Sequence, residues 1–362
     1  MIKAREAIQK MESYEYPTPF RKVISRYNIP INKIIKVNFN ESPFPPSQKV
    51  KEALIKFIEN GSLEWYPDES YDELRDAIAK LNDIEKERVI VGNGTDELLK
   101  EIIFTFVDRV DEVIIPIPNF SMYKIYAESI DANIIEVKYN ENLTLDVIKL
   151  LESINEETRM ILISNPNSPI GNTITKKDII KILEKAKNAI VVIDEAYYEF
   201  YGKTIVDQIK KYQNLIVLRT FSKAYGLASL RIGYAVASEE IIQELNKAKN
   251  PFNVNKLGEI AAIAALKDQN YMKKVVNEVK RTREYLTKEL RKLGLRVCPS
   301  KTNFILARFS KNTDLICKKL EKKGIFLRDT SKIFKLENCL RIAVPLMKDA
   351  PRLVNEIEEV LT

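Results

Sequence analysis

Short apolar runs rich in β-branched residues alternate with amphipathic helical patterns from about residue 89 to residue 248. Strands that are separated by helices predict a parallel sheet of the α/β class. The runs are nearly continuous, which predicts that helices cover both faces of the sheet. We therefore predict a mostly parallel seven-stranded sheet in an α/β/α sandwich, with strands at Val89–Val91, Val113–Ile115, Ile134–Val137, Met160–Ile163, Ile190–Ile193, Leu215–Leu218 and Ile232–Val236.

The rest of the chain predicts a second, smaller α+β domain. Two helical stretches follow Pro251, at Leu257–Lys267 and Tyr271–Leu293, and the second is charged along one side. Strands are then expected near Arg296–Cys298, Asn303–Phe309, Ile325–Leu327 and Leu340–Ala343, with helices at Thr313–Lys323 and Asp349–Val360. We expect residues 38–270 to form the large domain, and residues 1–37 to join residues 271–362 in the small one.

The composition narrows the available chemistry. The chain contains no histidine, which excludes histidine general bases, Ser-His-Asp triads and most zinc sites. Cys298, Cys317 and Cys339 form no CxxC pair, so neither a disulfide framework nor a thiolate metal site is indicated. Catalysis would therefore depend on Lys, Tyr, Asp or Glu, or on a cofactor, and we expect no metal.

Charge and hydropathy narrow the expected partners and location. The net charge of +7 comes from basic and acidic residues that are mixed along the chain, so nucleic acid is not an expected partner. No apolar run approaches the length of about 18 residues that a membrane span needs. The N-terminal stretch MIKAREAIQKMESYEY has the mixed charges of a helix and lacks the apolar core of a signal peptide. We expect a cytoplasmic protein.

Polar segments follow several of the predicted strands. Open α/β sheets bind ligands outside the carboxyl ends of their strands, so these segments are expected around one crevice. They are residues 92–96 after the first strand, Phe120 after the second, residues 165–171 after the fourth, Asp194 after the fifth and Lys223 after the sixth.

The segment RTFSKAYGLASLR, residues 219–231, suggests chemistry on an imine. Lys223 comes just after an apolar strand, and Thr220, Ser222 and Arg231 are of the donor types that hold a phosphate dianion. A phosphorylated aldehyde cofactor would suit both features. Taken alone, the segment fits a surface lysine and arginine in a strand-to-helix loop better, and only the rest of the chain favours the functional interpretation.

Two further motifs have a functional and an ordinary interpretation. GNGTDE, residues 92–97, is a strand–turn–helix junction whose free N–H groups at Thr95 and Asp96 could face an anion, or it is a capped turn. In VVIDEAYYEF, Asp194 and Tyr197 lie three residues apart and could face one ligand. A carboxylate beside a pyridine nitrogen keeps that ring protonated. Otherwise Asp194 is a helix cap and Tyr197 a core aromatic residue.

Together these motifs resemble the fold-type I pyridoxal-phosphate enzymes, specifically the class I and II aminotransferases of the aspartate aminotransferase superfamily. Within that superfamily the chain is similar to the histidinol-phosphate aminotransferase branch. The resemblance runs from about Asn38 to Val344, with order and spacing matched throughout. It rests on NFNESPFPPS at 38–47, YPD at 66–68, GNGTDE, NPNSPIG at 165–171, DEAYYEF at 194–200, RTFSKAYGLASLRIGY at 219–234 and LRI at 340–342.

The resemblance implies pyridoxal 5′-phosphate as the cofactor and a role for each matching residue. Lys223 is the Schiff-base lysine, Asp194 pairs with the pyridine nitrogen and Tyr197 meets the ring hydroxyl. Phe120 stacks on the cofactor ring, and Tyr66 reaches the cofactor phosphate of a neighbouring subunit, which implies a homodimer. The remaining residues that would hold the cofactor are Gly94, Thr95, Asp96, Asn167, Ser168, Thr220, Ser222 and Arg231.

The resemblance also marks a substrate site and some departures from the family. Arg341 matches the arginine that binds the substrate carboxylate or phosphate, Arg328 matches the second anion-binding arginine of the branch, and Asn40 is placed near them. Ser168 stands where the family has an asparagine that donates to the ring hydroxyl, so either Ser168 or Asn167 would donate. Phe20 stands at the position assigned to a substrate-binding tyrosine, and the sequence after Arg341 lacks the usual glycine-containing turn.

The resulting hypothesis is an aminotransferase that moves an amino group to a 2-oxo acid such as 2-oxoglutarate. Histidinol phosphate is the leading amino donor, as part of histidine biosynthesis. Three alternatives stay open at this point. They are an aromatic or broad-specificity aminotransferase, a decarboxylase of the threonine-phosphate type, and a non-catalytic binding module, against which the intact Lys223 and Asp194 argue.

Overall fold

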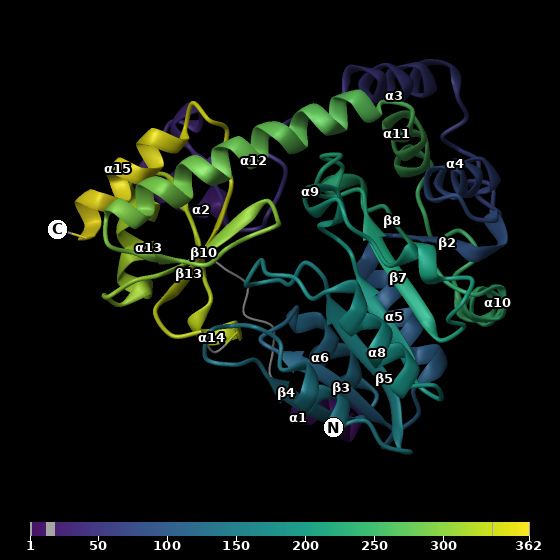
Figure 1. Cartoon of the computed structure of the whole chain (residues 1–362). Coiled ribbons are helices and arrows are strands. Elements are labelled where there is room, and N and C mark those ends of the chain that lie inside the picture. The colour runs from purple at the N-terminus through teal and green to yellow at the C-terminus, as the bar shows by residue number, and fades with distance from the viewer. Residues whose placement is uncertain (1, 12–18, 335, 362) are drawn as a thin grey trace.

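The computed structural model describes residues 2–11, 19–334 and 336–361 (Figure 1). Its largest sheet has seven strands, as the sequence predicted, and their order is β2-β8-β7-β6-β5-β3-β4. The strands are β2 (Val89–Gly92), β3 (Glu112–Ile117), β4 (Asn133–Lys138), β5 (Thr158–Ser164), β6 (Ile190–Asp194), β7 (Leu215–Thr220) and β8 (Gly233–Val236).

One strand of this sheet runs against the others. β8 pairs antiparallel with both β2 and β7, while β3, β4, β5, β6 and β7 pair in parallel. The sequence pattern predicted a helix between each pair of consecutive strands, and this prediction was wrong for the connection between β7 and β8. Only a 3₁₀ turn, Ala228–Leu230, lies between β7 and β8, and a parallel connection needs a longer crossover, usually an α-helix.

Helices cover both faces of the sheet, and the strand residues alternate between two apolar cores. One core joins Val191, Val217 and their face of the sheet to α4, α8 and α11, and the other joins Val192, Leu218 and the opposite face to α5, α6 and α10. The helices around this sheet are α3 (Gln48–Asn60), α4 (Asp72–Asn82), α5 (Thr95–Phe106), α6 (Ser121–Ser129), α7 (Val147–Glu152), α8 (Lys176–Lys185), α9 (Tyr198–Tyr201), α10 (Glu239–Ala248) and α11 (Lys256–Leu266).

Side-chain caps fix where several of these helices begin. Ser47 accepts a hydrogen bond from the Val50 N–H at the start of α3, and Thr175 caps α8 and Ser238 caps α10 in the same way. A cap of this kind satisfies one of the N–H groups that the first turn leaves without a partner in the helix. The polar residues at these positions therefore specify the helix boundaries.

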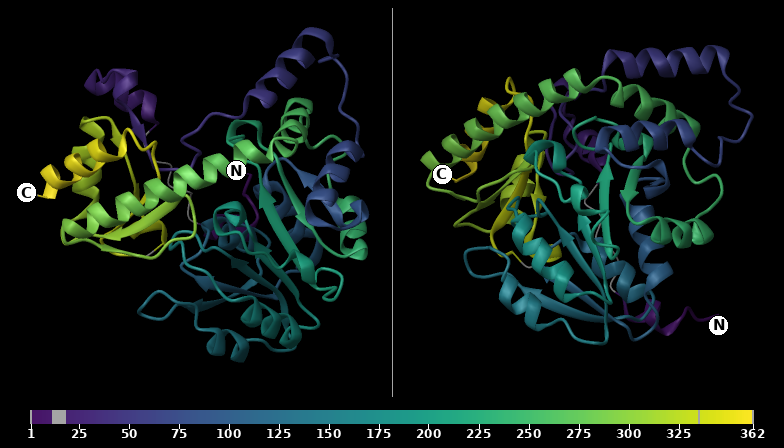
Figure 2. Two further views of the ribbon diagram at one scale, coloured as in Figure 1. Left: turned by 45° about the horizontal axis from the view of Figure 1, so that its top comes forward. Right: turned by 45° about the vertical axis from the view of Figure 1, so that its right-hand side comes forward.

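A smaller unit is built around a four-stranded antiparallel sheet in the order β12-β13-β10-β9. Helix α12 runs from the seven-stranded unit to this smaller unit, as Figures 1 and 2 show. The elements here are α12 (Gln269–Lys292), β9 (Arg296–Val297), β10 (Phe304–Arg308), α13 (Thr313–Lys322), β11 (Ile325–Phe326), β12 (Arg328–Asp329), α14 (Ser331–Phe334), β13 (Cys339–Ala343) and α15 (Ala350–Leu361).

The segment before Asn38 is divided between the two units. β1 (Ile35–Lys36) pairs in parallel with β11, and α2 (Phe20–Tyr27) packs against α13. In contrast, α1 (Glu6–Lys10) packs against α6 of the large unit (Figure 1). The boundaries at residues 38 and 270 stay a prediction, with α1 as a departure from it. The N-terminal helix was expected over residues 1–16. The structure has α1 at Glu6–Lys10, and residues 1 and 12–18 lie outside the described part.

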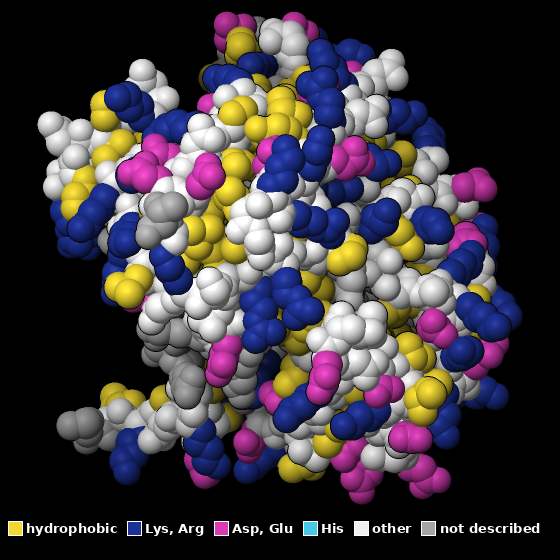
Figure 3. All heavy atoms as spheres, turned by 60° about the vertical axis from the view of Figure 1, so that its left-hand side comes forward, with side chains coloured by type: hydrophobic (Ala, Val, Ile, Leu, Met, Phe, Trp, Pro, Cys, Tyr) yellow, Lys and Arg dark blue, Asp and Glu magenta, His cyan; other side chains and the backbone are white. Residues whose placement is uncertain are grey.

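Two surface properties complete the description. Within the described ranges, no helix is both long and apolar enough to cross a membrane. On the face drawn in Figure 3, Lys and Arg side chains are interspersed with Asp and Glu.

Candidate active site

The loops at the carboxyl ends of the parallel strands meet around Lys223. This residue follows β7, and its Nζ atom donates to the Phe39 carbonyl oxygen at 3.4 Å. The same Nζ lies 5.9 Å from the centroid of the Tyr197 ring. The amine is therefore held between the segment that enters from the small unit and the loop that follows β6.

Asp194 ends β6 and presents a buried carboxylate, with 7% of the residue exposed. Its Oδ1 accepts from the Ala196 N–H at 2.9 Å, and its Oδ2 accepts from the Tyr123 hydroxyl at 2.8 Å. Burial raises the pKa of Asp194 to about 6, although these two donors and the nearby Lys223 favour the charged form. The site thus holds a carboxyl group whose ionised form would be favoured by a cationic ligand.

Tyr197 and Asn40 form a second polar contact of the site. The Asn40 side-chain amide donates to the Tyr197 hydroxyl at 2.9 Å. Asn40 itself has a left-handed backbone (φ 55°) and is held by Asn303, whose amide donates to the Asn40 carbonyl at 2.8 Å. Asn40 was expected beside the substrate, and the structure places it against a residue expected to contact the cofactor.

Arg231 lies beside the N-terminus of α5. Gly94 has φ 82°, and a Cβ atom there would lie 2.6 Å from Arg231 Nη2. The guanidinium also pairs with Asp96, with 2.9 Å between Arg231 Nη2 and Asp96 Oδ2. β8 approaches closely, since a Cβ atom at Gly233 would lie 2.8 Å from the Thr95 backbone nitrogen. Free N–H groups at a helix start beside a guanidinium suit a phosphate.

Thr220 and Ser222 add buried hydroxyl groups at the end of β7. The Ser222 N–H donates to Thr220 Oγ1 at 3.1 Å, which leaves the Thr220 hydroxyl proton available to an acceptor. Thr220 is the last residue of β7, and Ser222 directly precedes Lys223. The phosphate donors that the sequence predicted thus come from the ends of neighbouring strands.

Phe120 begins the turn into α6 and packs edge-on against Tyr123, with ring centroids 5.7 Å apart and planes at 89°. Phe120 was expected to stack on a cofactor ring. Tyr123 was not identified from the sequence, although it lies three residues further along the same motif, PNFSMY. Phe120 is the N-cap of α6 and Tyr123 lies in its first turn, so their closeness in this motif was the signal that could have indicated Tyr123.

The NPNSPIG loop gives its two polar candidates different surroundings. The Asn167 amide donates to the Pro118 carbonyl at 3.2 Å and to the Tyr139 hydroxyl at 3.1 Å, and its oxygen accepts from the Ile170 N–H at 3.0 Å. Ser168 Oγ instead accepts from Arg341 Nη1 at 3.3 Å. Asn167 is therefore engaged within the protein, and Ser168 is connected to the predicted substrate arginine.

Arg328 and Arg341 lie directly opposite each other on β12 and β13. Both are buried, with 7% and 8% exposed. Arg341 Nη2 donates to the Asn38 carbonyl at 3.1 Å, and the Arg328 guanidinium carbon lies 5.9 Å from the Phe39 ring centroid. The Phe39 carbonyl accepts from Lys223 Nζ. Both arginines therefore border the segment, Asn38 and Phe39, that contacts the Lys223 amine.

Tyr66 is not brought into the site of this chain. It is 80% exposed and stacks on Phe252, with ring centroids 4.5 Å apart. Phe20 begins α2, but its side chain lies outside the described part, so its position at the substrate stays a prediction.

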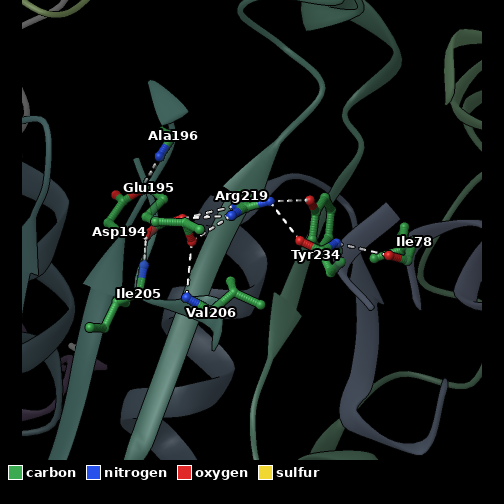
Figure 4. Close-up of polar contacts among 10 residues, drawn as sticks. Ile78, Asp194, Glu195, Ala196, Ile205, Val206, Arg219 and Tyr234 are labelled. Atoms are coloured by element: carbon green, nitrogen blue, oxygen red, sulfur yellow. Dashed lines mark hydrogen bonds and ion pairs between the residues drawn. The ribbon is translucent and has the colours of Figure 1, made fainter. Parts of the chain in front are cut away.

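A buried ion pair that the sequence analysis missed supports the two main strand ends (Figure 4). Glu195 follows Asp194, and Arg219 is the penultimate residue of β7. Arg219 donates to Glu195 Oε2 from Nη2 at 2.8 Å and from Nε at 3.0 Å, with both side chains almost fully buried. Charged residues inside the apolar runs of DEAYYEF and LRTFSK were the sequence signal. The pair connects the strand ends that carry Asp194 and Lys223.

These residues fit a phosphorylated pyridine aldehyde. The Gly94 backbone leaves space that a Cβ atom would fill, and Asp194 offers a buried acceptor near an amine. Asn119 Nδ2 and Asn40 Oδ1 are buried in this region and have no hydrogen-bond partner in the part of the chain that the structure describes, so polar groups remain for a ligand.

Comparisons with known proteins agree with this geometry. The family model described as aminotransferase class I and II matches residues 32–356. The histidinol-phosphate aminotransferase of Thermoanaerobacter pseudethanolicus is 39% identical over 360 residues, which cover 99% of this chain and 98% of that protein.

Two solved structures are similar to the chain. The histidinol-phosphate aminotransferase from Clostridium acetobutylicum has a TM-score of 0.85 and 27% identity, covering 91% of this chain and 99% of that one. The enzyme from Sinorhizobium meliloti, solved with pyridoxal-5′-phosphate, has a TM-score of 0.89 and 24% identity, covering 100% and 98%. At 24% identity, the similarity to the Sinorhizobium meliloti enzyme shows the fold alone.

Proposed function

The chain belongs to the class I and II aminotransferases, and from this membership we propose that it transfers the amino group of histidinol phosphate to 2-oxoglutarate. It is a pyridoxal-phosphate-dependent enzyme, so the family, the fold, the reaction class and the cofactor predicted from the sequence are confirmed. The choice of substrate and the role of each residue belong to the proposal, as does a cytoplasmic location.

Lys223 has the central role in the proposed reaction. Bound pyridoxal phosphate supplies an aldehyde that condenses with amines and a ring that withdraws electrons from the carbon undergoing reaction. Lys223 would hold the cofactor covalently and, as a free amine, would move a proton to and from the substrate carbon. The Phe39 carbonyl, 3.4 Å from Lys223 Nζ, orients that amine.

The other residues hold and orient the two ligands. The N-terminus of α5, with Arg231, Thr220 and Ser222, would hold the phosphate, and Phe120 would pack against the ring. Asp194 would accept a hydrogen bond from the ring nitrogen, and Tyr197, oriented by Asn40, would meet the ring hydroxyl. Ser168 would lie on the substrate side of the site, because its hydroxyl contacts Arg341. Asn167 stabilises the loop that carries Ser168.

The single observation that carries the substrate proposal is the cross-strand pair of Arg328 and Arg341. Two buried guanidinium groups in direct register favour a doubly anionic group or two separate acidic groups over a neutral side chain. Histidinol phosphate carries a phosphate dianion, and glutamate carries two carboxylates. One pocket can therefore serve both halves of the proposed reaction.

We expect Arg328→Ala to lower kcat/KM for histidinol phosphate by about tenfold to a hundredfold. A charge-assisted hydrogen bond contributes about 1.5–3 kcal/mol, and each 1.4 kcal/mol corresponds to about a factor of ten. Steady-state kinetics with histidinol phosphate and with phenylalanine would measure the change. Arg308→Ala is the matched control, because Arg308 ends β10 as an exposed residue.

Two outcomes would contradict this assignment. An unaffected Arg328→Ala variant would remove Arg328 from the substrate site. Negligible rates with histidinol phosphate beside good rates with phenylalanine or tyrosine would favour the broad-specificity alternative over the proposed one.

We also propose that the active form is a homodimer. The surface loop after α3 exposes Leu63, Trp65 and Tyr66, with the stacked Phe252 beside Tyr66. Exposed large apolar side chains that gather on one surface are typical of a protein interface. A second copy packed on this surface would bring the partner's Tyr66 to the phosphate site of the first.

Mixed dimers test whether the site is shared. We expect Tyr66→Phe to weaken cofactor affinity by about tenfold, through loss of one charge-assisted hydrogen bond. A mixed dimer of the Tyr66→Phe and Lys223→Ala chains should contain one intact site with normal affinity, because Lys223 and Tyr66 would come from different chains. If that dimer keeps only the weakened affinity, Tyr66 acts within its own chain or not at all.

A further inference from the structure

A buried tyrosine that no step of the proposed reaction uses donates to the carboxylate of Asp194. Tyr123 lies on α6 with 0% of the residue exposed, and its hydroxyl is 2.8 Å from Asp194 Oδ2. The Ala196 N–H donates to the other oxygen, Oδ1, at 2.9 Å. Each carboxylate oxygen therefore has one donor from the protein and a remaining lone pair for a ligand.

The groups around Asp194 favour opposite charge states. Burial has the largest effect and raises the pKa of Asp194 to about 6, and Asp96 adds to that rise. Tyr123, the Ala196 N–H and Lys223 act in the other direction, the tyrosine more strongly than the other two. Without the phenol, the carboxyl group would be neutral over more of the physiological pH range.

Tyr123 is suited to this task because it stays a neutral donor. Burial, followed by the charge of Asp194, raises the pKa of Tyr123 well above its usual range. Tyr139 and Ser164 are the other polar side chains that act on it. The phenol therefore keeps its proton throughout the pH range in which Asp194 titrates.

We propose that Tyr123 is a positioning residue that keeps Asp194 ionised and directs it at the ring nitrogen of the cofactor, and so sets the charge of that ring. The inference rests on the proposed function, since it assumes that the cofactor binds beside Asp194. Tyr123 also makes a second contact in the site. Its ring packs edge-to-face with Phe120, the residue expected to stack on the cofactor ring.

Tyr123→Phe removes the hydroxyl and keeps the ring contacts. We expect kcat to fall by about tenfold to a hundredfold and the affinity of the apoenzyme for pyridoxal phosphate to fall by about tenfold, since a hydrogen bond to a charged group is lost. The visible absorbance of the bound cofactor depends on pH, and the midpoint of that dependence should move upward. With Asp194 less ionised, the cofactor ring would carry less positive charge, and a less positive ring would repel the proton on the Lys223 nitrogen less. Tyr212→Phe is the matched control, as it loses a tyrosine–carboxylate hydrogen bond to Glu184 outside the site.

A double-mutant cycle with Asp194→Asn separates a positioning role from simple packing. If Tyr123 acts through Asp194, its substitution should have little further effect in the Asp194→Asn background. An equal effect in both backgrounds, or an unchanged absorbance titration in Tyr123→Phe, would overturn the inference.

If Tyr123→Phe does not fold, the test uses 3-fluorotyrosine at position 123, which is a stronger hydrogen-bond donor than tyrosine. That substitution should move the pH midpoint of the absorbance downward, and an unchanged midpoint would overturn the inference. A wild-type enzyme that binds no cofactor would instead contradict the proposed function.

Discussion

Replacing Lys223 with alanine is expected to lower turnover by about 10⁴-fold, the upper end of what a positioned general acid–base group contributes. The variant loses both the covalent link to the cofactor and the amine that moves the proton. It should keep its fold, because Lys223 is only partly buried and its Nζ atom makes a long hydrogen bond, 3.4 Å, to the Phe39 carbonyl. Steady-state kinetics and a thermal melt of the same sample would measure both expectations.

Chemical trapping provides the complement to that variant. Borohydride reduction of the holoenzyme, followed by peptide mapping, should place the cofactor on Lys223. Labelling of a different lysine would contradict the assignment. Lys203→Ala is a matched control, because Lys203 lies beside the Tyr201 ring after α9 and has no role in the proposed site.

Asp194→Asn is expected to lower kcat by about 10³-fold, the magnitude associated with removing one preorganised electrostatic group from an active site. The substitution preserves shape but leaves the ring nitrogen without an anionic partner. Cofactor affinity should fall much less, by about tenfold, because the phosphate contacts remain. A variant with normal turnover would show that Asp194 has no role in catalysis and serves only the local hydrogen bonds with Ala196 and Tyr123.

The same substitution should stabilise the apoenzyme at neutral pH. The pKa of Asp194 rises from 3.8 to about 6 on folding, so the folded state binds the proton more tightly and stability falls as pH rises from about 4 to about 6. At about 1.4 kcal/mol per unit, the penalty at pH 7 is about 3 kcal/mol. Apo Asp194→Asn should therefore melt higher than apo wild type at pH 7, and the difference should disappear toward pH 3.5.

The sequence predicted the large sheet and the position of the site, for physical reasons that lie in local patterns. Continuous apolar runs are required of strands covered on both faces, and their positions follow β2 to β8 closely. The rule that ligands bind at the carboxyl ends of strands then placed Asp194 and Lys223 in one crevice. The structure brings these residues together, and their roles stay proposals.

Features that depend on tertiary contacts were not predictable in the same way. β8 is antiparallel because of its short connection. The expected strand at Ile325–Leu327 corresponds to β11, which pairs with β1, and the sequence did not predict β12, which follows it and pairs with β13. Tyr123 lies 71 residues before Asp194 in the chain, so no local pattern connects them. Sequence also left Asn167 and Ser168 equivalent, because both are polar, and only their hydrogen-bond partners distinguish them.

The central claim is that this enzyme removes the amino group of histidinol phosphate, and a half-reaction tests it most directly. Purified holoenzyme would be mixed with histidinol phosphate in the absence of any oxo acid, and the visible absorbance of the cofactor would be followed. We predict stoichiometric conversion of the bound cofactor to its amine form, and its return to the aldehyde form when 2-oxoglutarate is added. The claim would be contradicted by a spectrum that does not change with histidinol phosphate, together with a decarboxylase reaction. In that reaction the enzyme would release carbon dioxide from a phosphorylated amino acid and keep its cofactor in the aldehyde form.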